Sequence, residues 1–223
     1  MAPSARSEPL AIPVHMTFPE SLVLVGKPLT LADLEDVARR GRSVALCPDA
    51  RARVHASRGA IDAIAAQGDD APAVYGVNTG FGALAETRIA EKDVRALQRN
   101  LVRSHACGIG PDLGIAEVRA MMLLRAQVIA LGYSGVRALV IDQLVAMLNR
   151  GVTPRVPAQG SVGASGDLAP LAHLALVLIG EGEATFDSRK MPGGEALAAA
   201  GLAPIELAAK EGPALIHGTQ YMT

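Results

Sequence analysis

The chain has 223 residues, of which 50% are hydrophobic, 19% charged and 3% aromatic, and its formal net charge is −1. This composition predicts a globular protein with an aliphatic, alanine-rich core and excludes a disordered chain. Because the chain has no basic excess and only 3% aromatic residues, no nucleic-acid partner is expected. Two cysteines in a chain of this length indicate no disulfide framework.

The longest apolar run, residues 168–180, is shorter than the roughly 20 residues that a membrane span needs. The N-terminus lacks an apolar signal core, so we expect a cytoplasmic protein that does not associate with membranes. The five histidines and two cysteines show no metal-ligand spacing, so no protein-bound metal is expected.

The first part of the chain predicts a short α/β region. Residues 1–20 carry scattered prolines, serines and charges and are expected to form a loose leader. Residues 30–33 resemble a capping box and predict a helix that ends at Gly41. Residues 43–47 predict a short strand.

Further along the chain, the pattern alternates between helices and a glycine-rich loop. Asp49 is expected to cap a second helix, which ends at Gly68. Residues 73–84 contain three glycines and no helical period, which predicts a loop with unusual backbone dihedrals. Helical patterns then resume over about 92–107, 114–131 and 135–150.

The last third leads from an extended connection into a glycine-serine segment. Residues 153–157 contain two prolines and predict an extended connection. Asp167 is expected to open a helix that tolerates Pro170 in its first turn. Residues 207–223 predict a helix or loop that stops within the fold.

The segment 160–167, with the sequence GSVGASGD, does not match common glycine loops. A phosphate loop would need a lysine after its final glycine, and a serine-hydrolase elbow would need the spacing G-x-S-x-G. Two interpretations remain open, which are a tight glycine turn before a buried helix and a cyclisation of the backbone.

The cyclisation would join the Gly166 amide nitrogen to the Ala164 carbonyl carbon. Loss of two waters, one of which carries the Ser165 hydroxyl, would leave a ring with an exocyclic methylene. Glycine is needed at position 166 because a side chain would block this approach. The product would be a strong electrophile at the positive end of a helix dipole.

The whole of residues 160–173 is similar to the signature of the histidine, phenylalanine and tyrosine ammonia-lyases. The resemblance implies a methylidene-imidazolone that forms autocatalytically from Ala164, Ser165 and Gly166, assisted by Asp167, without an external cofactor. It also implies a mainly α fold, with a small N-terminal α/β region and an electrophile-bearing loop at a helix N-terminus. The family forms homotetramers whose active sites draw on several subunits.

A second match concerns the general base. Loss of ammonia from an amino acid requires removal of a weakly acidic β-proton, so a base must lie near the electrophile. Residues 75–82, YGVNTGFG, resemble the family loop in which Tyr75 would be that base. Asn78 and Gly82 match family positions near the electrophile, where they are expected to contact the substrate. The alternatives are a packing role for Tyr75 and turn chemistry for the other two.

A third match bears on the substrate. Residues 100–108 resemble the family segment that selects the amino acid, and the pair Ser104 and His105 is typical of histidine lyases. A histidine there also occurs in bacterial tyrosine lyases, whereas phenylalanine lyases have apolar residues. A desolvated ring that carries N–H or O–H needs a polar partner. The alternative for His105 is a structural histidine on a helix, the role that we expect for His173.

Residues 209–220 resemble the second active-site segment of the family, with two departures. Pro213 replaces a leucine. His217 stands where the family has an asparagine against the electrophile and the substrate carboxylate, which adds bulk and a titratable group. These departures leave an aminomutase open as the activity.

The resemblance covers residues 30–223, and family chains continue well beyond this length. Residues 21–223 are therefore expected to be the N-terminal part of an ammonia-lyase fold that stops before the central helical bundle is complete. The predicted reaction converts L-histidine into trans-urocanate and ammonia, and the chain alone is expected to be inactive. A tyrosine ammonia-lyase, an aminomutase and a non-catalytic assembly module with an unmodified triplet are the alternatives.

Overall fold

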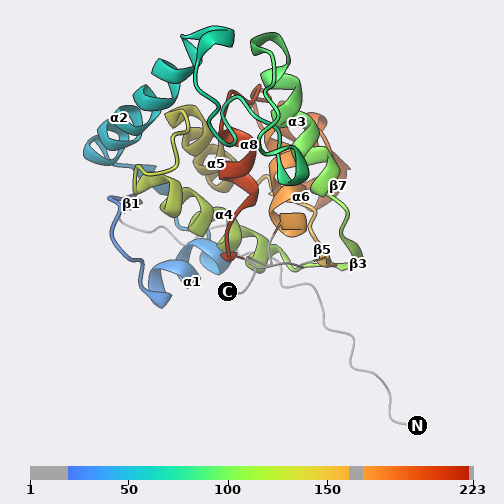
Figure 1. Cartoon of the computed structure of the whole chain (residues 1–223). Helices are drawn as coiled ribbons and strands as arrows, with labels where there is room; N and C mark the ends of the chain where they lie inside the picture. The colour runs from blue at the N-terminus through green and yellow to red at the C-terminus, as the bar shows by residue number, and fades with distance from the viewer. Residues whose placement is uncertain (1–19, 161–167, 221–223) are drawn as a thin grey trace.

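The computed structural model describes residues 20–160 and 168–220. In this part of the chain, helices predominate and the strands are short, which confirms the predicted mainly α class (Figure 1). Helix α4 packs against α1, α2 and α5, while α3, α6 and α8 pack against one another. No helix in the described ranges is long and apolar enough to cross a membrane.

The N-terminal region is a small β-α-β unit that consists of β1 (Leu22–Leu24), α1 (Leu31–Arg40) and β2 (Val44–Leu46). The two strands are parallel. The predicted capping box is present, because the Thr30 hydroxyl accepts a hydrogen bond from the Asp33 amide at 3.1 Å. Gly41 ends the helix with a φ of 74°, which a residue without a side chain adopts at no steric cost.

Helix α2 (Pro48–Ala65) corrects two details of the sequence analysis. Its cap is Cys47, whose Sγ accepts a hydrogen bond from the Ala50 amide, and Asp49 lies inside the first turn. The helix also ends at Ala65, before Gly68. Proline is favoured at the first helical position, because an N–H at that position would have no hydrogen-bond partner within the helix.

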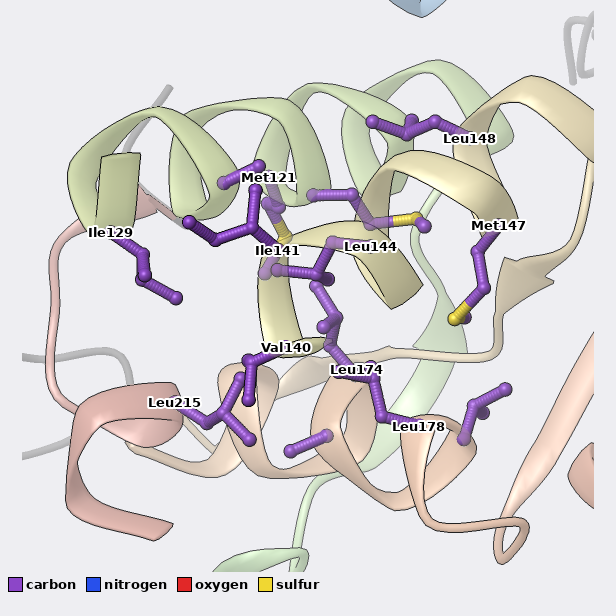
Figure 2. Close-up of a cluster of buried hydrophobic side chains, with 14 of the residues drawn as sticks. Met121, Ile129, Val140, Ile141, Leu144, Met147, Leu148, Leu174, Leu178 and Leu215 are labelled. Atoms are coloured by element: carbon purple, nitrogen blue, oxygen red, sulfur yellow. The ribbon is translucent and has the colours of Figure 1, made fainter. Parts of the chain in front are cut away.

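The next helices form the core of the described part. They are α3 (Val94–His105), α4 (Ile115–Ala130) and α5 (Ala138–Arg150), close to their predicted ranges. Figure 2 shows side chains of α5 between those of α4 on one side and those of α6 and α8 on the other. Met121 and Leu144 meet in this layer, and Leu174 and Leu215 reach it from the opposite side; all four are fully or almost fully buried.

The strands of the described residues form small sheets of two or three strands. Strand β3 (Ile109–Asp112) pairs with β5 (Pro157–Gln159), and β4 (Thr153–Pro154), β6 (Glu183–Phe186) and β7 (Arg189–Pro192) form an antiparallel sheet. The remaining elements are α6 (Leu168–Leu178), α7 (Gly193–Ala199), α8 (Glu211–Ile216) and 3₁₀ turns at Gly68–Asp70, Gly82–Leu84 and Glu91–Asp93. The extended connection through residues 153–157 is thus confirmed, whereas the hairpin at 183–192 was not predicted.

Candidate functional site

The predicted electrophile, formed by Ala164, Ser165 and Gly166 with Asp167 beside it, lies outside the described residues. Its two flanks are described, since β5 ends at Gln159 and α6 begins at Leu168. The connecting segment therefore leads directly to a helix N-terminus, where the backbone dipoles favour negative charge.

The upstream flank is pressed against the residues that follow α3. Gly160 has a φ of 138°, and a Cβ added to it would lie 2.9 Å from the Cα of Gly108. Any side chain at position 160 would therefore push these two segments apart. Glycine at this position keeps the end of α3 close to the start of the segment 161–167.

The downstream flank is attached to the same residues by a histidine. The Gly108 amide donates a hydrogen bond of 3.0 Å to Nε2 of His173, which lies in α6. Burial lowers the pKa of His173, and the nearby charge of Arg155 lowers it further. The neutral ring is the form that accepts this bond, which agrees with the structural role expected for His173.

His105 is the last residue of α3, three residues before Gly108. Its Nδ1 lies 2.9 Å from the carbonyl oxygen of Leu101, and the Ser104 hydroxyl donates to the same oxygen. The Ser104 hydroxyl also lies 3.1 Å from Nδ1. In the tautomer that donates to the Leu101 carbonyl, Nδ1 carries the hydrogen and Nε2 is an acceptor.

Tyr75 lies in the glycine-rich loop with its side chain half-exposed, at 47%. Its ring packs edge to face on Phe81, with the centroids 5.8 Å apart. The Asn78 side chain accepts a hydrogen bond from the Val74 amide and donates one to the Pro72 carbonyl, so it closes the loop. Gly82 has a φ of 56° and begins a 3₁₀ turn.

The Tyr75 loop is joined to the start of α8. The Lys210 amide donates a hydrogen bond of 3.0 Å to the Gly76 carbonyl. A Cβ on Gly76 would lie 3.3 Å from the ring of Pro213 and 3.4 Å from Nζ of Lys210. This close approach, together with a φ of 75°, explains why a glycine is needed at position 76.

Helix α8 is also held by a buried carboxylate. Glu211 is fully buried, and its two oxygens accept hydrogen bonds from the Arg137 guanidinium, the Arg137 amide and the Ala208 amide. Nη1 of Arg58 lies 3.9 Å from the same carboxylate. The hydrogen bond with Glu211 raises the pKa of Arg137. The carboxylate thus fixes α8 to α2 and to the start of α5.

At its other end, α8 is held by a buried arginine. Arg125 of α4 donates to the carbonyl oxygens of Ala214 and His217 and to the side-chain oxygen of Gln220. Burial lowers the pKa of Arg125 to about 10. Its position suits a cation, because the last carbonyls of a helix form the negative end of the dipole.

His217 directly follows α8, and its side chain is exposed. Nδ1 lies 3.0 Å from the carbonyl oxygen of Pro213 and therefore carries the hydrogen. A neutral His217 presents Nε2 as an acceptor, unlike the amide of an asparagine, which can also donate.

The structure thus brings the predicted residues together in two groups. Gly108, three residues after His105, contacts both flanks of the electrophile segment, while the loop of Tyr75 lies against the start of α8. The sequence did not indicate the roles of Lys210 and Arg125. Their side chains donate hydrogen bonds to carbonyl groups far away in the chain, and no residue pattern predicts such pairs. Residues 20–160 and 168–220 contain no group of three or more His, Cys, Asp or Glu residues placed to hold a metal ion.

Comparison with known proteins assigns the family. The family model for aromatic amino acid lyases matches residues 29–223, and the chain belongs to this family. A histidine ammonia-lyase from Sorangium cellulosum is 76% identical over 90% of the chain and 39% of its own length.

Solved structures agree with this assignment. The ergothionase from Treponema denticola has a TM-score of 0.85 and 34% identity, covering 91% of this chain and 40% of its own. The histidine ammonia-lyase from Trypanosoma cruzi has a TM-score of 0.82 and 38% identity, covering 91% and 38%. The chain therefore spans about two fifths of the length of these relatives.

Proposed function

We propose that the full-length protein that carries this chain is a histidine ammonia-lyase, which converts L-histidine into trans-urocanate and ammonia. The observation that carries the substrate assignment is the hydrogen bonding of His105. With Nδ1 donating to the Leu101 carbonyl, Nε2 of His105 would accept a hydrogen bond from the substrate. An imidazole N–H is a donor that fits this acceptor, whereas a phenyl ring has none. The identity of 76% to the relative from Sorangium cellulosum supports the same substrate.

The prosthetic group of this proposal is the methylidene-imidazolone formed from Ala164, Ser165 and Gly166. It supplies the electrophile that activates the amino acid for loss of ammonia. The described flanks fit such a group, because Gly160 packs tightly on Gly108 and the chain continues directly into a helix N-terminus. Asp167 would assist the cyclisation.

Tyr75 is the proposed general base, which removes the β-proton of the substrate. Its half-exposed phenol is free to reach a ligand, while Phe81 limits the movement of the ring. Removal of such a base typically costs on the order of 10²–10⁴-fold in rate.

Ser104, Asn78, Gly82 and His217 complete the proposed binding site. Ser104 and Asn78 act mainly by fixing the backbone, because their side chains bond to main-chain atoms of their own segments. Gly82 has no side chain, and a Cβ at this position would meet no atom within 4 Å. Position 82 therefore leaves space for a ligand. His217 would contact the carboxylate of the substrate.

The active protein is proposed to be a homotetramer in the cytoplasm, without an external cofactor or a nucleic-acid partner. Each active site would be completed by residues from neighbouring subunits. Membership of the family supports this assembly. The chain spans about two fifths of the length of its relatives. The 223-residue chain by itself is expected to be inactive.

The test uses the purified full-length protein, L-histidine and the absorbance of urocanate. We expect urocanate formation and an intact mass lower by two waters than the sequence predicts. Ser165→Ala should lose both properties and still fold, because only a hydroxyl is removed. An unmodified mass with no turnover would favour the assembly module, and turnover of L-tyrosine above L-histidine would favour a tyrosine lyase.

A further inference from the structure

Lys210 has a backbone conformation that few lysines adopt. Its φ is 74° and its ψ is −15°, in the left-handed region. A residue with a Cβ pays a steric penalty there that glycine avoids. Among residues 20–160 and 168–220, only Asp187, Ser188 and Lys210 have a positive φ without being glycine, and the first two form the turn of a hairpin. A lysine at such a position suggests that its side chain makes contacts that glycine could not make.

Those contacts all reach the loop of Tyr75. Nζ of Lys210 donates a hydrogen bond of 3.2 Å to the Tyr75 carbonyl. The same ammonium lies 5.8 Å from the centroid of the Tyr75 ring, within the range of a cation–π interaction. The left-handed backbone directs the Lys210 amide to the neighbouring carbonyl of Gly76, at 3.0 Å.

The Tyr75 ring is thereby restrained by two different partners. Phe81 contacts it edge to face, and the ammonium of Lys210 lies near the ring as well. Lys210 is itself fixed, because the next residue, Glu211, is buried in the ion pair with Arg137. The position of the phenol thus depends on α8, which lies more than a hundred residues further along the chain.

We propose that Lys210 is a positioning residue for Tyr75, which holds the carbonyl and the ring of that residue so that the phenol is presented to the substrate. This proposal rests on the proposed function of Tyr75 as the general base. Misplacement of a reacting group by about 1 Å can cost on the order of 10²-fold in rate, so the contact is sufficient to affect turnover.

The test compares variants of the full-length protein. Lys210→Met keeps the length of the side chain but removes the charge and the donor. Lys210→Gly also relieves the strained backbone. We expect both to lower kcat by about 10- to 100-fold with little change in KM. Lys210→Arg, which keeps a charged donor, should restore most of the rate. Lys92→Met, which changes an exposed lysine on another turn, is the control.

A double variant distinguishes positioning from a general structural effect. If Lys210 acts through the phenol, Lys210→Met should have almost no further effect on kcat in a Tyr75→Phe background. Equal losses in both backgrounds would overturn the proposal. If Tyr75→Phe alone kept the full rate, the proposed base would fail independently of Lys210. If the Lys210 variants kept the full rate while Tyr75→Phe lost it, Lys210 would have no positioning role and Tyr75 would remain the proposed base.

Hydrogen exchange gives a readout that does not depend on turnover. The amides of Val77 and Asn78 are bonded to the Val74 carbonyl within the loop. Lys210→Met should speed their exchange by about fivefold, the effect expected when one net hydrogen bond is lost. Unchanged exchange in this variant would overturn the proposal, whatever the activity of the protein.

Discussion

Replacement of Glu211 by glutamine tests whether the buried carboxylate holds α8, the helix that lies between Lys210 and His217. Glu211 is fully buried and accepts hydrogen bonds from two groups of Arg137 and from the Ala208 amide. Glutamine has nearly the same shape. However, one of its two polar atoms is a donor, which would face N–H groups that also donate.

The expected loss of unfolding free energy depends on how exposed Glu211 and Arg137 are. Removal of one member of a buried ion pair costs about 3–5 kcal/mol, since the other charge is left without compensation. The Arg137 side chain is 36% exposed, so water can solvate its guanidinium after the change. We therefore expect Glu211→Gln to lower the free energy of unfolding by about 3 kcal/mol, the lower end of that range. For a domain of this size, the melting temperature should fall by about 6–12 °C.

Glu206→Gln is a matched control, because Glu206 also pairs with an arginine in the same segment. Its bond to Arg95 is 2.6 Å long, but the two side chains are 70% and 68% exposed. Such surface pairs contribute about 0–1 kcal/mol. Urea denaturation of the 223-residue chain would measure both variants. A loss in Glu211→Gln no larger than that in Glu206→Gln would refute the argument that this carboxylate holds α8.

Three further predictions concern histidines. His105→Phe should lower kcat/KM for L-histidine relative to L-phenylalanine by about 10- to 100-fold, since an unpaired polar group costs roughly 1–3 kcal/mol; equal effects on both substrates would make His105 structural. Because burial lowers the pKa of His173, the unfolded chain binds a proton that the folded one does not, so stability should fall as the pH drops below about 6.5. His173→Gln should flatten this dependence in denaturation measured from pH 7 to 5, and an unchanged slope would contradict the assignment. His217→Asn provides an amide donor that can bond the substrate carboxylate and should lower KM for L-histidine; an unchanged KM would oppose this reasoning.

Local signals in the sequence predicted the parts of the fold that depend on local chemistry. Thr30 and Gly41 mark the two ends of α1 because capping and left-handed φ values are properties of a few neighbouring residues. The cap of α2 was assigned wrongly, since a cysteine such as Cys47 is a weak acceptor and Asp49 is a stronger signal two residues later. Both helices were predicted, and only the cap and the end of the second were misplaced.

The elements that were missed depend on distant partners. The turn of the β6–β7 hairpin is Asp187-Ser188, with φ values of 46° and 61°, and it lacks the glycine that usually marks such a turn. Strand β6 also pairs with Thr153 and Pro154, which lie about thirty residues earlier. Neither feature leaves a periodic signal. For the same reason, the motif placed Tyr75 in a loop but gave no indication that Lys210 holds it.

Helix α8 shows why residues of the candidate site are hard to separate from residues of the core. A helix of six residues is unstable alone, because nucleation is costly and few hydrogen bonds follow it. Its position is therefore imposed from outside, by Arg137 on Glu211, by Gln98 on the Gly212 amide and by Arg125 on the last carbonyls. Each of these contacts is structural, yet together they determine where the helix ends and therefore where His217 lies. A change in any of them is expected to alter turnover without touching the substrate.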